Sequence, residues 1–227
     1  MFARLFAFLL ALFFAGAAQA LSFDSLSNKD AGGGLKEALS QGASLAVDQL
    51  GKTDGFMGNP KVRIPLPENL EKAEGLLRTM GAGKYVDELE VAMNRAAEAA
   101  VPEAKALLLK SIKSMSLQDA KGILGGGDDA ATQYFRRTTS APLGEKFKPI
   151  VQKAIAKVQL AEKYDQFAGR AAKLGLVKEG DAHLDNYITQ KALDGLYLMI
   201  AEQEKAIRKD PLSATGSLAK KVFGLLR

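Results

Sequence analysis

Acidic and basic side chains gather in one short stretch near the middle of the chain, residues 125–137. Three glycines are followed there by Asp128 and Asp129, and the stretch ends with Arg136 and Arg137. Two adjacent carboxylates suit acid–base chemistry or a hard cation such as Ca²⁺ or Mg²⁺. Two adjacent guanidinium groups suit a carboxylate or a phosphate, because each presents a fork of N–H donors. The stretch is therefore the first candidate for a functional site.

The glycines and acids of this stretch predict that a helix begins there. Glycine adopts backbone angles that other residues avoid, so residues 125–127 suit a sharp reversal between two helices. Asp128 is predicted to be the structural helix cap, with its carboxylate accepting backbone N–H groups of the first turn. Asp129 then falls where negative charge is favoured. One face of this helix and its edge present five candidate ligand- or partner-binding residues: Asp129, Gln133, Tyr134, Arg136 and Arg137.

Two interpretations of these residues stay open. In the structural one, Asp128 caps the helix, Phe135 lies in the core, and the arginines pair with acids on neighbouring helices. In the functional one, the arginines and Tyr134 form a site for an anionic ligand or a partner protein. Asn94 and Arg95, at the edge of another predicted apolar stripe, complete the candidate set.

A catalytic use of Asp128 and Asp129 is the weaker alternative, because Ca²⁺ and Mg²⁺ sites need more oxygen ligands than two residues supply. The chain contains no cysteine, which excludes thiol chemistry and cysteine-based zinc or iron–sulfur sites. Its one histidine, His183, lies in a polar turn without a second histidine to share a metal. No Walker, dinucleotide-binding or Gly-x-Ser-x-Gly motif is present. We therefore predict no metal site and no cofactor.

Hydrophobic periodicity predicts that helices position these residues. Apolar side chains recur at three- and four-residue steps through most of the chain. Helices are predicted over residues 33–50, 67–80, 84–100, 103–115 and 186–209, and a short one is capped by Ser116. After residue 137, a new helix start is predicted at Pro142 and a break or kink at Pro149. The predicted fold class is all-α, a single multi-helix domain with one extended Pro-rich arm over about residues 52–67.

The first 20 residues have the order of a secretory signal peptide. Arg4 precedes an apolar run, and Ala18 and Ala20 flank Gln19 at a suitable cleavage site. The run is shorter than the ~20 apolar residues of a membrane span. We therefore predict a signal peptide over residues 1–20, a helical domain over residues 21–227, and a periplasmic location. Without Arg4 the formal charge falls from +5 to +4, a mild excess that does not indicate a nucleic-acid partner.

The last residues form a second amphipathic candidate. Leu218, Val222 and Leu225 make an apolar stripe beside Lys220 and Lys221. Such a helix suits weak contact with a membrane surface. A terminal helix docked on the domain is the more ordinary interpretation of the same pattern.

Several longer motifs resemble those of one bacterial family. The motifs are residues 59–67 (NPKVRIPLP), 93–98 (MNRAAE), 119–124 (DAKGIL), 126–137 (GGDDAATQYFRR) and 188–196 (ITQKALDGL). They resemble the bacterial domain-of-unknown-function 4197 family, and the resemblance covers nearly all of the chain after the signal peptide. It implies an exported, periplasmic, helical protein of a Gram-negative bacterium. It implies no activity.

The function predicted from these observations is non-enzymatic binding or scaffolding in the cell envelope. The expected partner is another envelope protein or an anionic ligand. Two alternatives remain open. One is a hydrolase or metal-dependent enzyme that uses Asp128 and Asp129, and the other is a peripheral membrane protein that uses the C-terminal helix.

Overall fold

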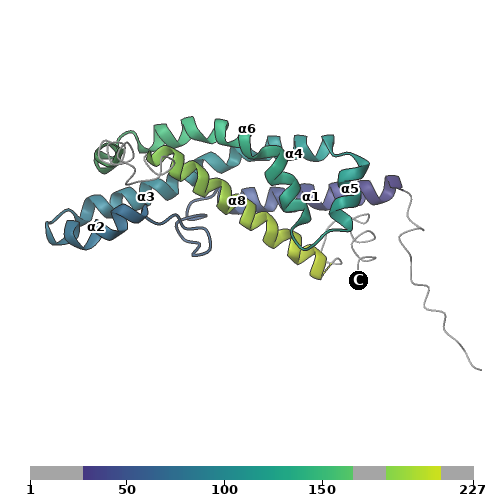
Figure 1. Ribbon diagram of the computed structural model, residues 1–227, viewed down its shortest axis with the longest axis horizontal. Coiled ribbons are helices and arrows are strands. Elements are labelled where there is room, and N and C mark those ends of the chain that lie inside the picture. The colour runs from purple at the N-terminus through teal and green to yellow at the C-terminus, as the bar shows by residue number, and fades with distance from the viewer. Residues whose placement is uncertain (1–27, 166–182, 211–227) are drawn as a thin grey trace, which may run out of the picture.

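The computed structural model describes residues 28–165 and 183–210, which form helices joined by turns and loops (Figure 1). The predicted signal peptide and the predicted C-terminal amphipathic helix lie outside these residues. The helices are α1 (Asn28–Leu50), α2 (Glu68–Thr79), α3 (Gly83–Ala100), α4 (Ala104–Ser114), α5 (Leu117–Leu124), α6 (Ala130–Ile155) and α8 (Leu184–Lys209). A 3₁₀ turn, η2 (Val101–Glu103), joins α3 to α4. Since no strand occurs in the two described ranges, the prediction of an all-α domain is confirmed.

The core is built around the long helix α8. This helix packs against α6, α1 and α3, and α6 also packs against α3 and α4 (Figure 1). Ile188, Leu196 and Ile200 are among the buried apolar side chains of α8. Burying a side chain of this size contributes roughly 1.5–3 kcal/mol, so these contacts hold the helices together. α2 packs mainly along α3 and extends with it to one end of the molecule.

α6 continues through two prolines. The sequence predicts a new helix start at Pro142, but α6 runs through this residue, so that prediction is wrong. The helix also continues through Pro149, so no break occurs there. A proline inside a helix costs roughly 3 kcal/mol. Leu143, Phe147 and Val151 are fully buried along the same helix. At roughly 1.5–3 kcal/mol each, their burial offsets the cost of the prolines.

The segment between α1 and α2, residues 52–67, is here called the connector. The sequence predicts an extended arm over these residues, but residues 53–58 and 60–62 form turns, so the extended arm is not confirmed. Gly55 makes the first turns possible. A Cβ atom at this position would lie 2.6 Å from the carbonyl oxygen of Gln49. The chain therefore folds back closely on the end of α1.

Alternate side chains of the connector pack into the core. Val62, Ile64 and Leu66 are buried, as their alternation with exposed residues predicts. Phe56 is also buried, and its ring lies against Gly195 on α8, where a Cβ atom would come within 2.7 Å of the ring. Because Gly195 has no side chain, the connector can pack closely against α8 at this point.

α5 begins with the capping box that the sequence predicts at Ser116. The Ser116 hydroxyl accepts a hydrogen bond from the Asp119 backbone N–H at 3.1 Å, and the Asp119 carboxylate accepts one from the Ser116 backbone N–H at 3.2 Å. Hydrogen bonds from the Ser116 side chain and backbone hold the pKa of Asp119 below its usual value. The positive charge of Arg137 lowers the pKa of Asp119 further.

A pKa that is lower in the folded protein makes stability depend on pH. The stability from ionised Asp119 is present above the usual aspartate pKa and is lost as the pH falls through the lowered value. Replacing Asp119 with asparagine should therefore destabilise the protein at neutral pH and make less difference in strong acid. Urea unfolding at several pH values measures this difference, with the exposed Asp128→Asn as the matched control. A difference that stays constant down to strong acid would contradict the prediction.

Candidate functional site

The structure places Asp129, not Asp128, at the N-cap of α6. The Asp129 side chain makes no capping hydrogen bond and instead accepts one from Gln133 Nε2 at 2.9 Å. Asp128 lies exposed one residue earlier. The prediction that Asp128 is the structural helix cap is therefore wrong, because the N–H groups of the first turn bond to a carboxylate from another helix.

That carboxylate belongs to Glu204 on α8. It accepts hydrogen bonds from the backbone N–H groups of Ala131 (3.0 Å) and Thr132 (2.9 Å) and from the Thr132 hydroxyl (2.9 Å). Arg208 Nη2 lies 2.9 Å from the same carboxylate and donates to the Ile123 carbonyl oxygen at 2.9 Å. Only 3% of the Glu204 side chain is exposed. This buried ion pair within α8 therefore binds to the end of α5 and the start of α6. The i,i+4 spacing of Glu204 and Arg208 is local, but no local pattern in the sequence indicates their contacts with α5 and α6.

Arg136 and Arg137 point to different helices. The Arg136 guanidinium pairs with Asp194 on α8 at 3.1 Å and lies 4.7 Å from the centre of the Tyr197 ring. The Arg137 guanidinium pairs with Asp119 on α5 at 3.1 Å. The two arginine side chains are 43% and 65% exposed. They form two separate ion pairs rather than one fork for a shared anion.

Tyr134 supports this part of α6 from the inside. The residue is buried, and its hydroxyl donates to the Ser111 carbonyl oxygen on α4 at 2.8 Å. The Arg137 guanidinium lies 5.5 Å from the centre of the Tyr134 ring. Tyr134 is therefore a core residue with a satisfied polar end, the usual state of a buried tyrosine.

Asn94 and Arg95 lie on α3, where both hold the connector. Asn94 is fully buried; its side-chain oxygen accepts the Ile64 N–H at 2.8 Å, and its amide donates to the Ile64 carbonyl oxygen at 3.0 Å. Arg95 pairs with Glu98 at 2.6 Å and with Asp54 at 2.7 Å. The residues singled out from the sequence therefore do not converge on one site.

A groove lies around the first half of α8 instead. It consists of three adjoining hollows, here called the α8-start hollow, the middle hollow and the α2 hollow, with volumes of about 490, 520 and 560 Å³. The middle hollow shares Lys148 and Asn186 with the α8-start hollow. It shares Asn186 and Gln190 with the α2 hollow. We call the whole the α8 groove, and among the sequence-predicted site residues only Arg136 lines it.

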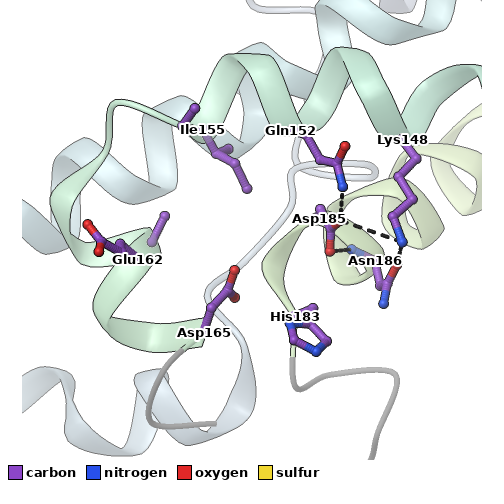
Figure 2. A pocket seen from close by; sticks show the side chains of 10 residues that line it. Lys148, Gln152, Ile155, Glu162, Asp165, His183, Asp185 and Asn186 are labelled. Carbon is purple, nitrogen blue, oxygen red and sulfur yellow. Dashed lines mark hydrogen bonds and ion pairs between the residues drawn. The ribbon is translucent and has the colours of Figure 1, made fainter. Parts of the chain in front are cut away.

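The α8-start hollow lies where the second half of α6 meets the first turn of α8 (Figure 2). Its lining residues are Lys148, Gln152, Ile155, Ala156, Ala161, Glu162, Asp165, His183, Asp185 and Asn186. Gln152 Nε2 donates to Asp185 Oδ2 at 2.6 Å. Lys148 Nζ donates to Asn186 Oδ1 at 2.8 Å and lies 3.6 Å from Asp185 Oδ2. Figure 2 shows these four side chains together, with Asp165 apart from them.

Asp165 caps the start of α8 from outside the helix. Its carboxylate accepts the Leu184 backbone N–H at 2.9 Å. Burial raises the pKa of Asp165 above its usual value, while the Leu184 N–H and the charge of His183 oppose this rise. In residues 28–165 and 183–210, no group of three or more His, Cys, Asp and Glu side chains is placed to hold a metal ion.

The middle hollow lies between α6 and α8. Its lining residues are Arg136, Ser140, Ala141, Gly144, Glu145, Lys148, Asn186, Thr189, Gln190, Leu193 and Tyr197. Neighbouring side chains hold several of its polar groups: Ser140 Oγ donates to the Tyr197 hydroxyl at 3.1 Å, and Gln190 Nε2 donates to Asp194 Oδ1 at 3.2 Å. Thr189 differs, because its Oγ1 is buried and has no hydrogen-bond partner within the described part of the chain.

The α2 hollow lies between α8, the connector and the start of α2. Its lining residues are Pro65, Leu66, Glu68, Glu71, Asn186, Tyr187, Gln190, Lys191 and Asp194. The Tyr187 hydroxyl donates to the Pro65 carbonyl oxygen at 3.1 Å, and the Lys191 ammonium lies 5.5 Å from the centre of the Tyr187 ring. The groove thus presents both hydrogen-bond donors and acceptors, an arrangement suited to a polar partner.

Sequence reasoning does not find this groove, because its residues come from distant segments. The start of α2, the second half of α6 and the first half of α8 meet only in the folded protein. The segment 188–196, which carries part of the family resemblance, supplies Thr189, Gln190 and Asp194. That segment is the available sequence signal, although its residue types indicate no particular chemistry.

Among the described helices, none has the length and apolar character needed to cross a membrane. Comparison with curated proteins gave no match, and comparison with solved structures gave none either. One family model does match, that of a protein of unknown function described as DUF4197, and the match covers residues 25–224. Since the match includes nearly the whole chain, the protein belongs to the DUF4197 family.

Proposed function

We propose that this protein is an exported, non-enzymatic binding protein of the bacterial cell envelope, and that its partner binds in the α8 groove. The observation that carries this proposal is that three hollows adjoin one another around the first half of α8, through the shared residues Lys148, Asn186 and Gln190. Interaction surfaces bind more favourably when their side chains are already ordered, because less conformational entropy is lost. The hydrogen bonds of Lys148, Gln152 and Gln190 within the groove provide such order.

The location in the envelope is supported by the N-terminal sequence. Arg4, the apolar run after it and the small residues Ala18 and Ala20 have the order of a cleavable export signal. The chain contains no cysteine, so its stability in an oxidising compartment would come from packing alone. The proposal therefore has two parts: the chain is exported, and its folded helices form a binding surface.

Site-specific photo-crosslinking in the native envelope tests the proposal. A photoreactive residue at Gln190, an exposed position in the middle of the groove, should give a discrete adduct with an envelope component. The same residue at Lys205, an exposed position on the same helix outside the groove, is the matched control. Equal adducts at both positions, or none at either, would count against a binding role for the groove.

A separate measurement tests export. Mass spectrometry of the protein recovered from the periplasmic fraction should show a chain that begins at Leu21. A chain that begins at Met1 and stays in the cytoplasmic fraction would remove the envelope from the proposal. The adducts at Gln190 would then be tested in the cytoplasm.

A further inference from the structure

The end of the helical hairpin formed by α2 and α3 carries large apolar side chains on its surface. Leu76 and Met80 on α2 are 65% and 72% exposed, and Tyr85 on α3 is 45% exposed. Leu76 and Met80 are four residues apart, so they lie on one side of α2. Single exposed apolar residues are normal, whereas neighbouring ones mark a surface that binds a partner.

A hollow of about 230 Å³ adjoins these side chains, between the hairpin and the residues that follow α6. Its lining residues are Leu77, Ala82, Tyr85, Val86, Gln159, Leu160 and Lys163. Tyr85 belongs both to the hollow and to the exposed apolar set, which makes them one surface. We call Leu76, Met80 and the residues of this hollow the hairpin patch. None of them lines the α8 groove, so the two surfaces are separate.

The hairpin that carries this patch is acidic. Residues 68–91 contain six carboxylates and three basic side chains, a formal charge of −3. One of the basic groups, Arg78, is already held by Glu74 at 2.8 Å and by Asp87 at 2.6 Å. Lys163 adds one positive charge in the hollow, which leaves the total negative. The hairpin patch therefore suits a basic apolar partner, whereas an anionic lipid surface attracts basic segments and repels carboxylates.

Residues 211–227 of the same sequence, here called the tail, have the complementary character. The tail contains no acidic residue, and its basic residues are Lys220, Lys221 and Arg227. Leu218, Val222 and Leu225 recur at helical spacing and form an apolar stripe. An amphipathic segment binds an apolar surface through such a stripe, and its basic side chains then meet the surrounding carboxylates.

The apolar stripe of the tail does not reach the hairpin patch of its own chain. The hairpin and the last residues of α8 lie at opposite ends of the molecule (Figure 1). α8 alone is about 39 Å long at 1.5 Å per residue. Leu218 follows Asp210 by eight residues, which span at most about 29 Å even when fully extended. The stripe can therefore cover a hairpin patch only on a second copy of the chain.

We propose that the hairpin patch of one copy binds the tail of a second copy, so that the protein associates head to tail. Two different surfaces meet in this contact, and each dimer keeps one unoccupied hairpin patch and one unoccupied tail. Such a contact can add further copies until a ring closes or a filament forms. One short segment covers less area than a standard protein interface of about 1,600 Å², so the association is weak and depends on concentration.

Sedimentation velocity of the purified chain without its predicted signal peptide, residues 21–227, tests the inference. The sedimentation coefficient should rise with protein concentration. Met80→Glu on the hairpin and Val222→Glu on the tail each place a charge in the apolar contact and should abolish this rise. Leu117→Glu, at a 59% exposed leucine on α5 outside the patch, is the matched control and should keep it. A monomer at every concentration, or equal losses for all three variants, would overturn the inference.

A mixture of the two variants tests the head-to-tail arrangement itself. Met80→Glu keeps its tail and Val222→Glu keeps its hairpin patch, so the mixture should form dimers with one copy of each and nothing larger. Association of Val222→Glu alone would show that hairpin patches pair with one another. A mixture that stays monomeric would show that the tail binds elsewhere, on its own chain or on a membrane. Either result would overturn the inference.

The charges of the tail provide a further test that leaves the apolar stripe intact. The double variant Lys220→Gln/Lys221→Gln removes two positive charges and should weaken association about tenfold. Higher salt should weaken the association of the unmodified chain in the same direction, because it screens exposed charges. Association that changes with neither the double variant nor salt would contradict the pairing of a basic tail with an acidic hairpin.

Discussion

Replacing Glu204 with alanine should lower the free energy of unfolding by about 3–5 kcal/mol, the cost of removing one partner from a buried ion pair. The substitution removes the Glu204 carboxylate from beside the Arg208 guanidinium, which is 12% exposed. It also leaves the N–H groups of Ala131 and Thr132 without an acceptor at the start of α6. Urea denaturation monitored by circular dichroism measures the change.

Glu202→Ala is the matched control for this prediction. Glu202 lies two residues earlier on α8, and its carboxylate pairs with the exposed Lys61 at 2.6 Å. An exposed pair of this kind contributes only about 0–1 kcal/mol. If Glu204→Ala and Glu202→Ala gave equal losses, the Glu204 carboxylate would not be stabilising the start of α6.

Replacing Asn94 with alanine should destabilise the protein by about 2–4 kcal/mol. The side chain of Asn94 satisfies both the N–H and the carbonyl oxygen of Ile64, and all of these atoms are buried. Each buried polar group left without a partner costs about 1–3 kcal/mol. The connector should therefore loosen on α3, and thermal denaturation should show a lower Tm.

Two further variants sharpen this result. Asn69→Ala changes an exposed asparagine on α2 and should have little effect. Asn94→Asp keeps an acceptor for the Ile64 N–H but places a buried carboxylate opposite the Ile64 carbonyl oxygen, so its loss should be at least as large as that of Asn94→Ala. A small loss for Asn94→Ala would indicate that water replaces the side chain.

Much of the fold follows from short-range sequence patterns. Leu35, Leu39, Ala46 and Leu50 recur at helical spacing, and all four are buried on α1. The same reasoning predicts α3, α4 and α8 within a few residues of their ends. These predictions succeed because an amphipathic helix needs only one apolar stripe, which local spacing reveals.

Interruptions and ends of helices are harder to predict, because long-range contacts decide them. Pro142 and Pro149 have a local tendency to stop a helix, yet the burial of α6 outweighs it. Asp128 has the residue type of an N-cap, yet Glu204 on another helix caps α6. A rule based on nearby residues cannot include a partner 73 positions away.

The candidate site is predicted from the sequence only in part. Arg136 is a charged residue next to a second arginine, in the stretch 125–137 that the sequence singles out, and it does line the α8 groove. Lys148, Thr189 and Gln190 are common polar residues within regular helical patterns, so the sequence alone does not single them out. They form a site only because α6 packs against α8, a contact that the periodicity of either helix does not specify.

The capping of α6 by a residue of α8 has a consequence for the order of folding. During synthesis, Ala131 is added to the chain 73 residues before Glu204. The N–H groups of the first turn of α6 therefore bond to water until Glu204 is present. Contacts between positions far apart in sequence form late, because closing a long loop costs entropy before the contact stabilises the chain. The start of α6 should therefore be among the last parts to become rigid, when α8 docks. A chain that ends before residue 204 would keep a frayed first turn in α6, however well its other helices form.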